Sequence, residues 1–181
     1  DGDRIIYNTT ANWRSARSRV PISSGVDSFQ LRLRTVTAAN IIIGYMSASA
    51  TLEDYVGADA NGWGWYAVNS QAQHNGVATA SLTASPSTTD RIRMTYDADA
   101  GEIRIYFNET TLEHTYTGVV GPLYRASSCK DSEFAIYEQV QSGAKASIPA
   151  AEPDKAFYSA SGVLLSNVTI HYSIFSEGQL D

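Results

Sequence analysis

Alternation of apolar and polar residues is the clearest pattern along this chain. Residues 29–35 place Phe and Leu on one parity and Gln and Arg on the other, and a similar period of two runs through residues 91–96, 102–107 and 168–174. A strand points successive side chains to opposite faces, so this period predicts one buried face and one face in water. β-branched and aromatic residues dominate these runs, as a pleated surface prefers. The pattern therefore predicts antiparallel β-sheets.

Turn-forming residues divide these runs at intervals of roughly 8 to 15 residues, as at Asn75-Gly76 and Gly121-Pro122. Many short strands with such spacing predict an all-β fold of the sandwich or jelly-roll type. Helical spacing of apolar residues occurs within residues 48–60 and predicts a short helical turn there. The apolar run over residues 163–175 is expected to pair near Ile5–Tyr7, because a sandwich often brings its last strand beside its first.

The composition agrees with one folded domain. The chain has 181 residues, of which 43% are hydrophobic and 18% charged, and a chain of this size can build a core without staples. We therefore expect a single domain over residues 1–181. The absence of an initiating methionine favours a domain cut from a larger protein. A single cysteine, Cys129, favours a reducing compartment and hence an intracellular location.

Charge and hydropathy argue against two classes of partner. A net charge of -6 is unfavourable for broad binding to a phosphate backbone, so no nucleic acid is expected. No apolar run approaches the roughly 18 residues needed to cross a bilayer, so no membrane is expected. The basic cluster of Arg14, Arg17 and Arg19, beside Trp13, is a local exception. Such a cluster suits an acidic peptide or a phosphate group.

Three carboxylates, Asp97, Asp99 and Glu102, resemble the acid cluster of some sandwich-fold glycosidases. Those enzymes need two carboxyl groups about 5 to 5.5 Å apart, facing the sugar. Here Ala100-Gly101 interrupts the alternation between two apparent strands, which is typical of a hairpin turn. We therefore interpret the segment as a turn, and a calcium loop is disfavoured because a bidentate Glu at the twelfth position is lacking.

Other chemical motifs are weak. Residues 62–67 match the dinucleotide-binding pattern formally, but a loop precedes them and a strand-like run follows. The three histidines are far apart, no His or Cys pair has metal-ligand spacing, and no nucleophile elbow occurs. The sequence therefore predicts no catalytic residue, no metal site and no cofactor.

Six short segments occur in an order and spacing that resemble one family. They are Ser24-Gly25 with residues 29–33, residues 42–45, residues 55–57 with 61–65, residues 73–76, residues 97–108 and residues 121–124. Together they resemble the SPRY domain, the core of the B30.2 family, over about residues 24–138. The resemblance implies a bent antiparallel β-sandwich of the concanavalin-like jelly-roll type. It further implies a non-catalytic, monomeric module that recognises a short segment of a partner protein through loops at one edge.

The resemblance also implies which residues contact the partner. Three segments correspond to contact loops of some family members, and from them we expect these contacts: Trp13, Arg14 and Arg17; Tyr55, Val56 and Gly57; and Cys129, Lys130 and Asp131. The chain departs from the family pattern at Glu109, where a turn Gly is usual, and at Arg125, where Pro is usual. Cys129-Lys130 replaces the Trp-Gly of some peptide-binding relatives, so their peptide motif is not assumed.

Three other functions remain open at this stage. A lectin-like carbohydrate-binding module on a jelly-roll scaffold would use exposed Trp or Tyr against a sugar face. A glycosidase would use the three carboxylates around residue 99. A purely structural domain would dock on its own neighbours in the parent protein.

Overall fold

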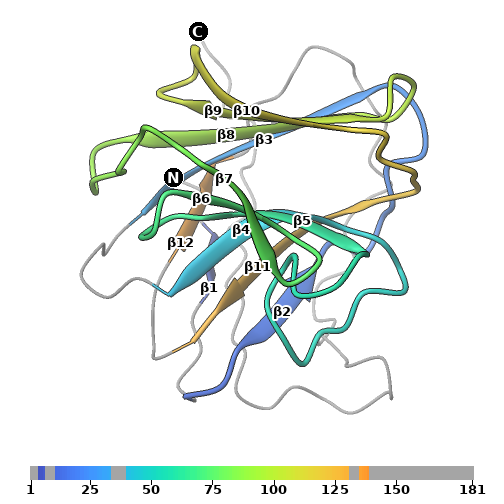
Figure 1. Cartoon of the computed structure of the whole chain (residues 1–181), viewed down its shortest axis with the longest axis horizontal. Helices are drawn as coiled ribbons and strands as arrows, with labels where there is room; N and C mark the ends of the chain where they lie inside the picture. Colours follow the sequence, from blue (N-terminus) through green and yellow to red (C-terminus); the bar gives the residue numbers. More distant parts are fainter. Residues whose placement is uncertain (1–3, 7–10, 34–39, 131–134, 139–181) are drawn as a thin grey trace, which may run out of the picture.

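The computed structural model describes residues 4–6, 11–33, 40–130 and 135–138, which form twelve strands in two antiparallel sheets (Figure 1). Sheet A contains, in spatial order, β1 (Arg4–Ile6), β12 (Ala135–Glu138), β3 (Val26–Leu33), β8 (Arg91–Asp97), β9 (Glu102–Phe107) and β10 (Thr111–Thr117). Sheet B contains β2 (Arg14–Arg17), β11 (Tyr124–Cys129), β4 (Ile41–Met46), β5 (Gly62–Tyr66), β6 (Gln71–His74) and β7 (Val77–Ser81). The predicted all-β sandwich is confirmed. No helix able to cross a membrane occurs in the described part of the chain.

The main hydrophobic core lies between the two sheets. Phe29 and Leu31 of β3 face it from sheet A, and Ile43, Tyr45 and Trp65 face it from sheet B, all with at most 2% of their surface exposed. Burial of a large apolar side chain contributes about 1.5–3 kcal/mol. The alternation over residues 29–33 thus identified the inward face of β3 correctly.

The outer face of sheet B differs from the sequence prediction. Strand β4 is buried on both faces, because the connection between β4 and β5, residues 47–61, packs against the outside of the sheet and forms a second apolar cluster. Its members are Ile42, Met46, Ala50, Leu52, Val56 and Ala126. The predicted helical turn is wrong: residues 48–60 form turns and bends, and their apolar side chains point to the sheet. We call residues 47–61 the covering loop.

Gly64 allows the covering loop to lie this close, and Gly44 allows β5 to lie close beside β4 under the loop. Gly44 and Gly64 are opposite each other in β4 and β5. A Cβ at Gly44 would come within 1.9 Å of the Trp63 carbonyl oxygen, and one at Gly64 would come within 2.8 Å of the Val56 carbonyl oxygen. Side chains at these positions would separate the strands or lift the loop. The floor of sheet B under the loop is therefore bare backbone.

An ion pair joins the two sheets near one end of the core. Arg125 of β11 donates through Nε to Asp27 of β3 at 2.8 Å, and its Nη2 donates to the other carboxylate oxygen. Tyr45 also donates to Asp27, at 2.9 Å. Burial, together with the Asp27 carboxylate, raises the pKa of Tyr45 well above its usual value. The Tyr45 hydroxyl is therefore a neutral donor at physiological pH.

The first strand pairs with a strand that the sequence pattern did not identify. Ile5 of β1 lies opposite Ile136 of β12. The run over residues 163–175, which we expected beside Ile5–Tyr7, lies outside the described residues, so that pairing stays a prediction.

Gly44→Ala is expected to destabilise the fold by more than about 3 kcal/mol, because the new methyl group meets backbone that cannot move aside. Gly118→Ala is the control: its φ of +70° also disfavours a side chain, but the space around it is open, so we expect about 1–2 kcal/mol. Urea unfolding monitored by Trp fluorescence measures both. A loss at Gly44 no greater than that at Gly118 would show that sheet B can relax.

Arg125→Met is expected to cost about 1–3 kcal/mol, since it strands the Asp27 carboxylate in a site where only 13% of that side chain is exposed. The double variant Asp27→Asn, Arg125→Met removes both charges, so its free energy of unfolding is expected to exceed that of the single variant. If the losses in the free energy of unfolding of the two single variants simply added in the double variant, the two residues would not be a coupled pair.

Candidate functional site

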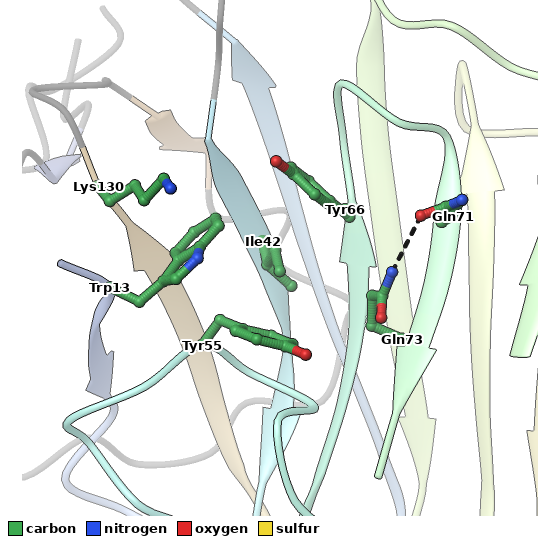
Figure 2. Close-up of a pocket in the computed structure, with 7 residues that line it drawn as sticks. All are labelled: Trp13, Ile42, Tyr55, Tyr66, Gln71, Gln73 and Lys130. Atoms are coloured by element: carbon green, nitrogen blue, oxygen red, sulfur yellow. Dashed lines mark hydrogen bonds between the residues drawn. The ribbon is translucent and has the colours of Figure 1, made fainter. Parts of the chain in front are cut away.

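The outer face of sheet B carries a hollow of about 180 Å³ beside the covering loop (Figure 2). Seven described residues line it: Trp13, Ile42, Tyr55, Tyr66, Gln71, Gln73 and Lys130. They come from the residue before β2, from β4, β5 and β6, from the covering loop and from the end of β11. Residues far apart in the sequence thus form one depression.

The strand register explains where the hollow lies. Ser15, Ser128, Ile42, Tyr66 and Gln71 are successive partners across β2, β11, β4, β5 and β6 and so form one row across the sheet. The neighbouring row on the same face contains the two glycines described above, and the covering loop fills the space over them. The hollow is the part of this face that the loop leaves open.

Three aromatic rings form the apolar walls. The Trp13 ring centroid lies 5.6 Å from that of Tyr55 and 5.8 Å from that of Tyr66, at interplanar angles of 57° and 83°. In Figure 2 the three rings surround the side chain of Ile42, which is buried. The Trp13–Tyr66 pair is edge-to-face, a favourable geometry for aromatic rings, and the Trp13–Tyr55 pair is tilted. The walls therefore hold one another in place around an open centre.

The two tyrosines add hydroxyl groups to this apolar surface. Burial raises the pKa of Tyr55, and the neighbouring Asp54 carboxylate raises it further. Burial also raises the pKa of Tyr66, whose hydroxyl donates to Asn40 Oδ1 at 2.7 Å. Both side chains are therefore neutral at physiological pH and present polar tips on apolar rings.

One wall is polar. Gln73 donates through Nε2 to Gln71 Oε1 at 3.1 Å, and both side chains belong to β6. A glutamine amide offers two N–H donors and a carbonyl acceptor, so this single bond leaves hydrogen-bonding capacity at the hollow. Amide groups in that position suit the main chain of a peptide.

Two buried serines hold the covering loop against β2 and β11. Ser15 donates its amide to the Leu52 carbonyl at 2.9 Å and its hydroxyl to the Asp54 carbonyl. The hydroxyl of Ser128 accepts the Val56 amide at 2.6 Å and lies 2.9 Å from that of Ser15. Because these bonds flank Tyr55, its position is set before any ligand arrives.

The structure brings three of the sequence-predicted contact residues, Trp13, Tyr55 and Lys130, to the hollow. Arg14 lies beside it, paired with Glu53 at 3.2 Å. Arg17 supports the loop from below, since its Nη1 donates to the carbonyl oxygens of Ser47 and Ala48 at 3.0 and 2.9 Å. Arg14 and Arg17 therefore hold the loop in place, where the sequence suggested a basic patch for a ligand.

Three other predicted contacts need correction. Val56 has no exposed surface and packs in the second apolar cluster. Cys129 is 4% exposed and points into the core between the sheets. Gly57 is buried, where a Cβ would lie 2.6 Å from the Gln73 carbonyl oxygen. Asp131 lies outside the described residues.

The sequence reasoning missed Ile42, Tyr66, Gln71 and Gln73 as lining residues. A signal for Tyr66 was present, because a period of two from Gly62 and Gly64 places it on the same face of the strand. No comparable signal marks β6, whose register slips by a bulge between Ala72 and Gln73.

The carboxylates near residue 99 form the predicted hairpin turn between β8 and β9. Asp97 Oδ1 accepts the amides of Asp99 and Ala100 at 3.1 and 2.9 Å, and Asp99 accepts that of Gly25. Gly101 has a φ of +64°, which suits glycine. The acids thus hold the backbone of the turn. Among the described residues, no group of three His, Cys, Asp or Glu side chains is placed to hold a metal ion.

Comparison with known proteins identifies the scaffold. The sequence profile of the SPRY domain matches residues 28–139. The SPRY domain of human HERC1 superposes with a TM-score of 0.66 at 17% identity, covering 76% of this chain and 89% of that one. The TRIM65 PSpry domain gives a TM-score of 0.57 at 16% identity, covering 70% and 71%. At such identities the structural likeness shows the fold alone. No curated protein sequence matches the chain.

Ser128→Ala is expected to loosen the covering loop, because the buried Val56 amide loses its acceptor. An orphaned buried donor costs about 1–3 kcal/mol. Hydrogen exchange at the Val56 amide should accelerate, while the Ile105 amide in sheet A reports any global change. Ser18→Ala, at an exposed serine hydroxyl, serves as the control. Equal protection of Val56 in all three proteins would contradict the role assigned to Ser128.

Proposed function

Because the chain belongs to the SPRY domain family, we propose that it is a non-catalytic recognition module whose aromatic hollow binds a short segment of a partner protein. SPRY domains are generally protein-interaction modules. The family alone does not locate a binding face, so the proposal depends on what the surface of sheet B offers.

The convergence of Trp13, Tyr55 and Tyr66 on one hollow carries the proposal. Trp and Tyr are enriched among the residues that dominate binding energy, above all in partly enclosed pockets. Their apolar bodies accept a side chain, while their polar tips and the glutamine amides accept main-chain groups. The loop that presents Tyr55 is held by buried hydrogen bonds, so little ordering cost accompanies binding.

We further propose that the domain lies in the cell interior and that it acts as the adaptor of a larger protein. Cys129, the one cysteine of the sequence, is buried, and a single cysteine favours a reducing compartment. The seven described residues that line the hollow come from one chain, and we propose that the domain acts as a monomer.

Carbohydrate binding is the second candidate. A hollow that has a Trp ring on one side and glutamine amides on the other also suits a sugar, whose apolar face stacks on the ring while its hydroxyls bond to the amides. A glycan array probed with the labelled domain distinguishes the two functions, because a peptide-binding hollow is not expected to retain any glycan.

The test selects displayed random 12-residue peptides on the domain and titrates the best one calorimetrically. Tyr55→Ala is expected to weaken that peptide by more than about 1 kcal/mol, roughly fivefold or more in Kd, because it removes one wall of the hollow. Tyr106→Ala, at a half-buried tyrosine of sheet A that stacks under Arg93, is the matched control and should bind like wild type. Equal affinities in all three proteins would place the binding face elsewhere, and failure to select any peptide would refute peptide recognition.

A further inference from the structure

Lys130 is the single charged residue among the seven that line the hollow. Its ammonium lies 5.7 Å from the centroid of the Trp13 ring, within cation–π range. Its main-chain amide donates to the Asn40 carbonyl at 3.2 Å, directly after β11. The stem of the side chain thus starts from a fixed point, and its charge stands at the edge of the aromatic walls, as Figure 2 shows.

The other charged groups of described residues around the hollow already have partners in the protein. Arg14 pairs with Glu53, and Asp54 accepts the Tyr55 amide at 2.8 Å. Arg17 is occupied by the two loop carbonyls and lies over the Tyr124 ring. No ion pair between described residues includes Lys130. Among the described residues around the hollow, the positive charge without an ion-pair or carbonyl partner is therefore that of Lys130, and not that of Arg14 or Arg17.

The Lys130 charge determines which of two kinds of ligand the hollow suits. A hollow with three aromatic walls would by itself suit a cation. Here an ammonium already stands over the Trp13 ring, so a second cation would be repelled. A neutral apolar group fits the walls, and a carboxylate beside it would meet Lys130.

The dimensions limit the apolar group to one side chain. A cavity of about 150 Å³ holds a benzene molecule, and the hollow measures about 180 Å³. One aromatic or large aliphatic side chain fills it. In an extended segment, side chains two residues apart lie on the same face about 7 Å apart, which is comparable to the 5.7 Å between the Trp13 ring and the Lys130 ammonium.

We propose that the hollow recognises an acidic segment: one aromatic or large aliphatic anchor side chain, with an Asp or Glu one or two residues away that pairs with Lys130. The inference rests on the proposed function and specifies its ligand. Lys130 and the two glutamines stand on opposite sides of the hollow in Figure 2. The anchor therefore lies between the carboxylate on one side and main-chain contacts to the amides on the other.

The experiment uses a nine-residue peptide library with Phe fixed at the centre and the other positions degenerate. Wild type, Lys130→Met, Lys130→Arg and the exposed-site control Arg19→Met each select from it. Wild type, Lys130→Arg and Arg19→Met are expected to enrich Asp or Glu at one position within two residues of the Phe. Lys130→Met, which keeps the length of the stem without the charge, is expected to lose this enrichment while still retaining peptides.

A double-mutant cycle makes the test quantitative. The best peptide is titrated with Glu or Gln at the enriched position, and wild type is expected to prefer Glu about fivefold, while Lys130→Met shows no preference. The wild-type preference should shrink as NaCl rises, because salt screens an accessible ion pair. Selection of peptides without an acidic position, or an acidic preference that survives in Lys130→Met, overturns the inference and leaves peptide recognition intact. Retention of no peptide by wild type overturns the proposed function itself.

Discussion

The packing of the covering loop on the outer face of sheet B is the contact on which the site depends. It brings the Val56 carbonyl oxygen against Gly64, where a Cβ would lie 2.8 Å from that oxygen, while Gly44 allows β4 and β5 to approach under the loop. Close packing of this kind excludes water and buries Leu52 and Val56 without a helix to carry them. Tyr55 lies between these constraints, so the loop that completes the second core also forms a wall of the hollow.

The basic residues near the hollow divide into two groups. Arg14 and Arg17 bind the covering loop, the first through Glu53 and main-chain carbonyls and the second through carbonyls alone. The charges of both arginines are thus engaged in contacts with the loop that shapes the site. Lys130 instead projects from the end of β11 beside Trp13. The distinction matters because a rim charge that forms no ion pair with the described residues influences which ligand enters, while an engaged charge mainly stabilises the surface.

The departures from the family pattern have physical consequences in this chain. Arg125, at a position where Pro is usual, reaches across the core to Asp27 and joins the sheets. Glu109 has a φ of +70° in place of the usual turn Gly, and its carboxylate accepts bonds from Gln30 and Arg91 at 2.9 and 3.0 Å. These bonds offset the strain of the left-handed conformation. One of them satisfies the Gln30 amide, which is buried on a face that alternation predicted to be wet.

Much of the scaffold followed from local sequence. The inward side chains of β3, β8 and β9, and the turn at residues 97–102, were predicted because strand periodicity and turn geometry act over a few residues. The family resemblance also indicated Trp13, Tyr55 and Lys130 as contact residues, and the structure brings these three to the hollow. The interior positions of Val56 and Cys129 were not predicted, since alternation defines two faces without saying which face another segment will cover.

The sequence by itself thus determined an antiparallel β-sandwich, its turns and the SPRY family pattern. The tertiary structure decided that residues 13, 42, 55, 66 and 130 share one hollow, because the order β2-β11-β4-β5-β6 and its register align distant positions across the sheet. Periodicity is a property of neighbouring residues, whereas a binding surface is made by contacts between strands far apart along the chain.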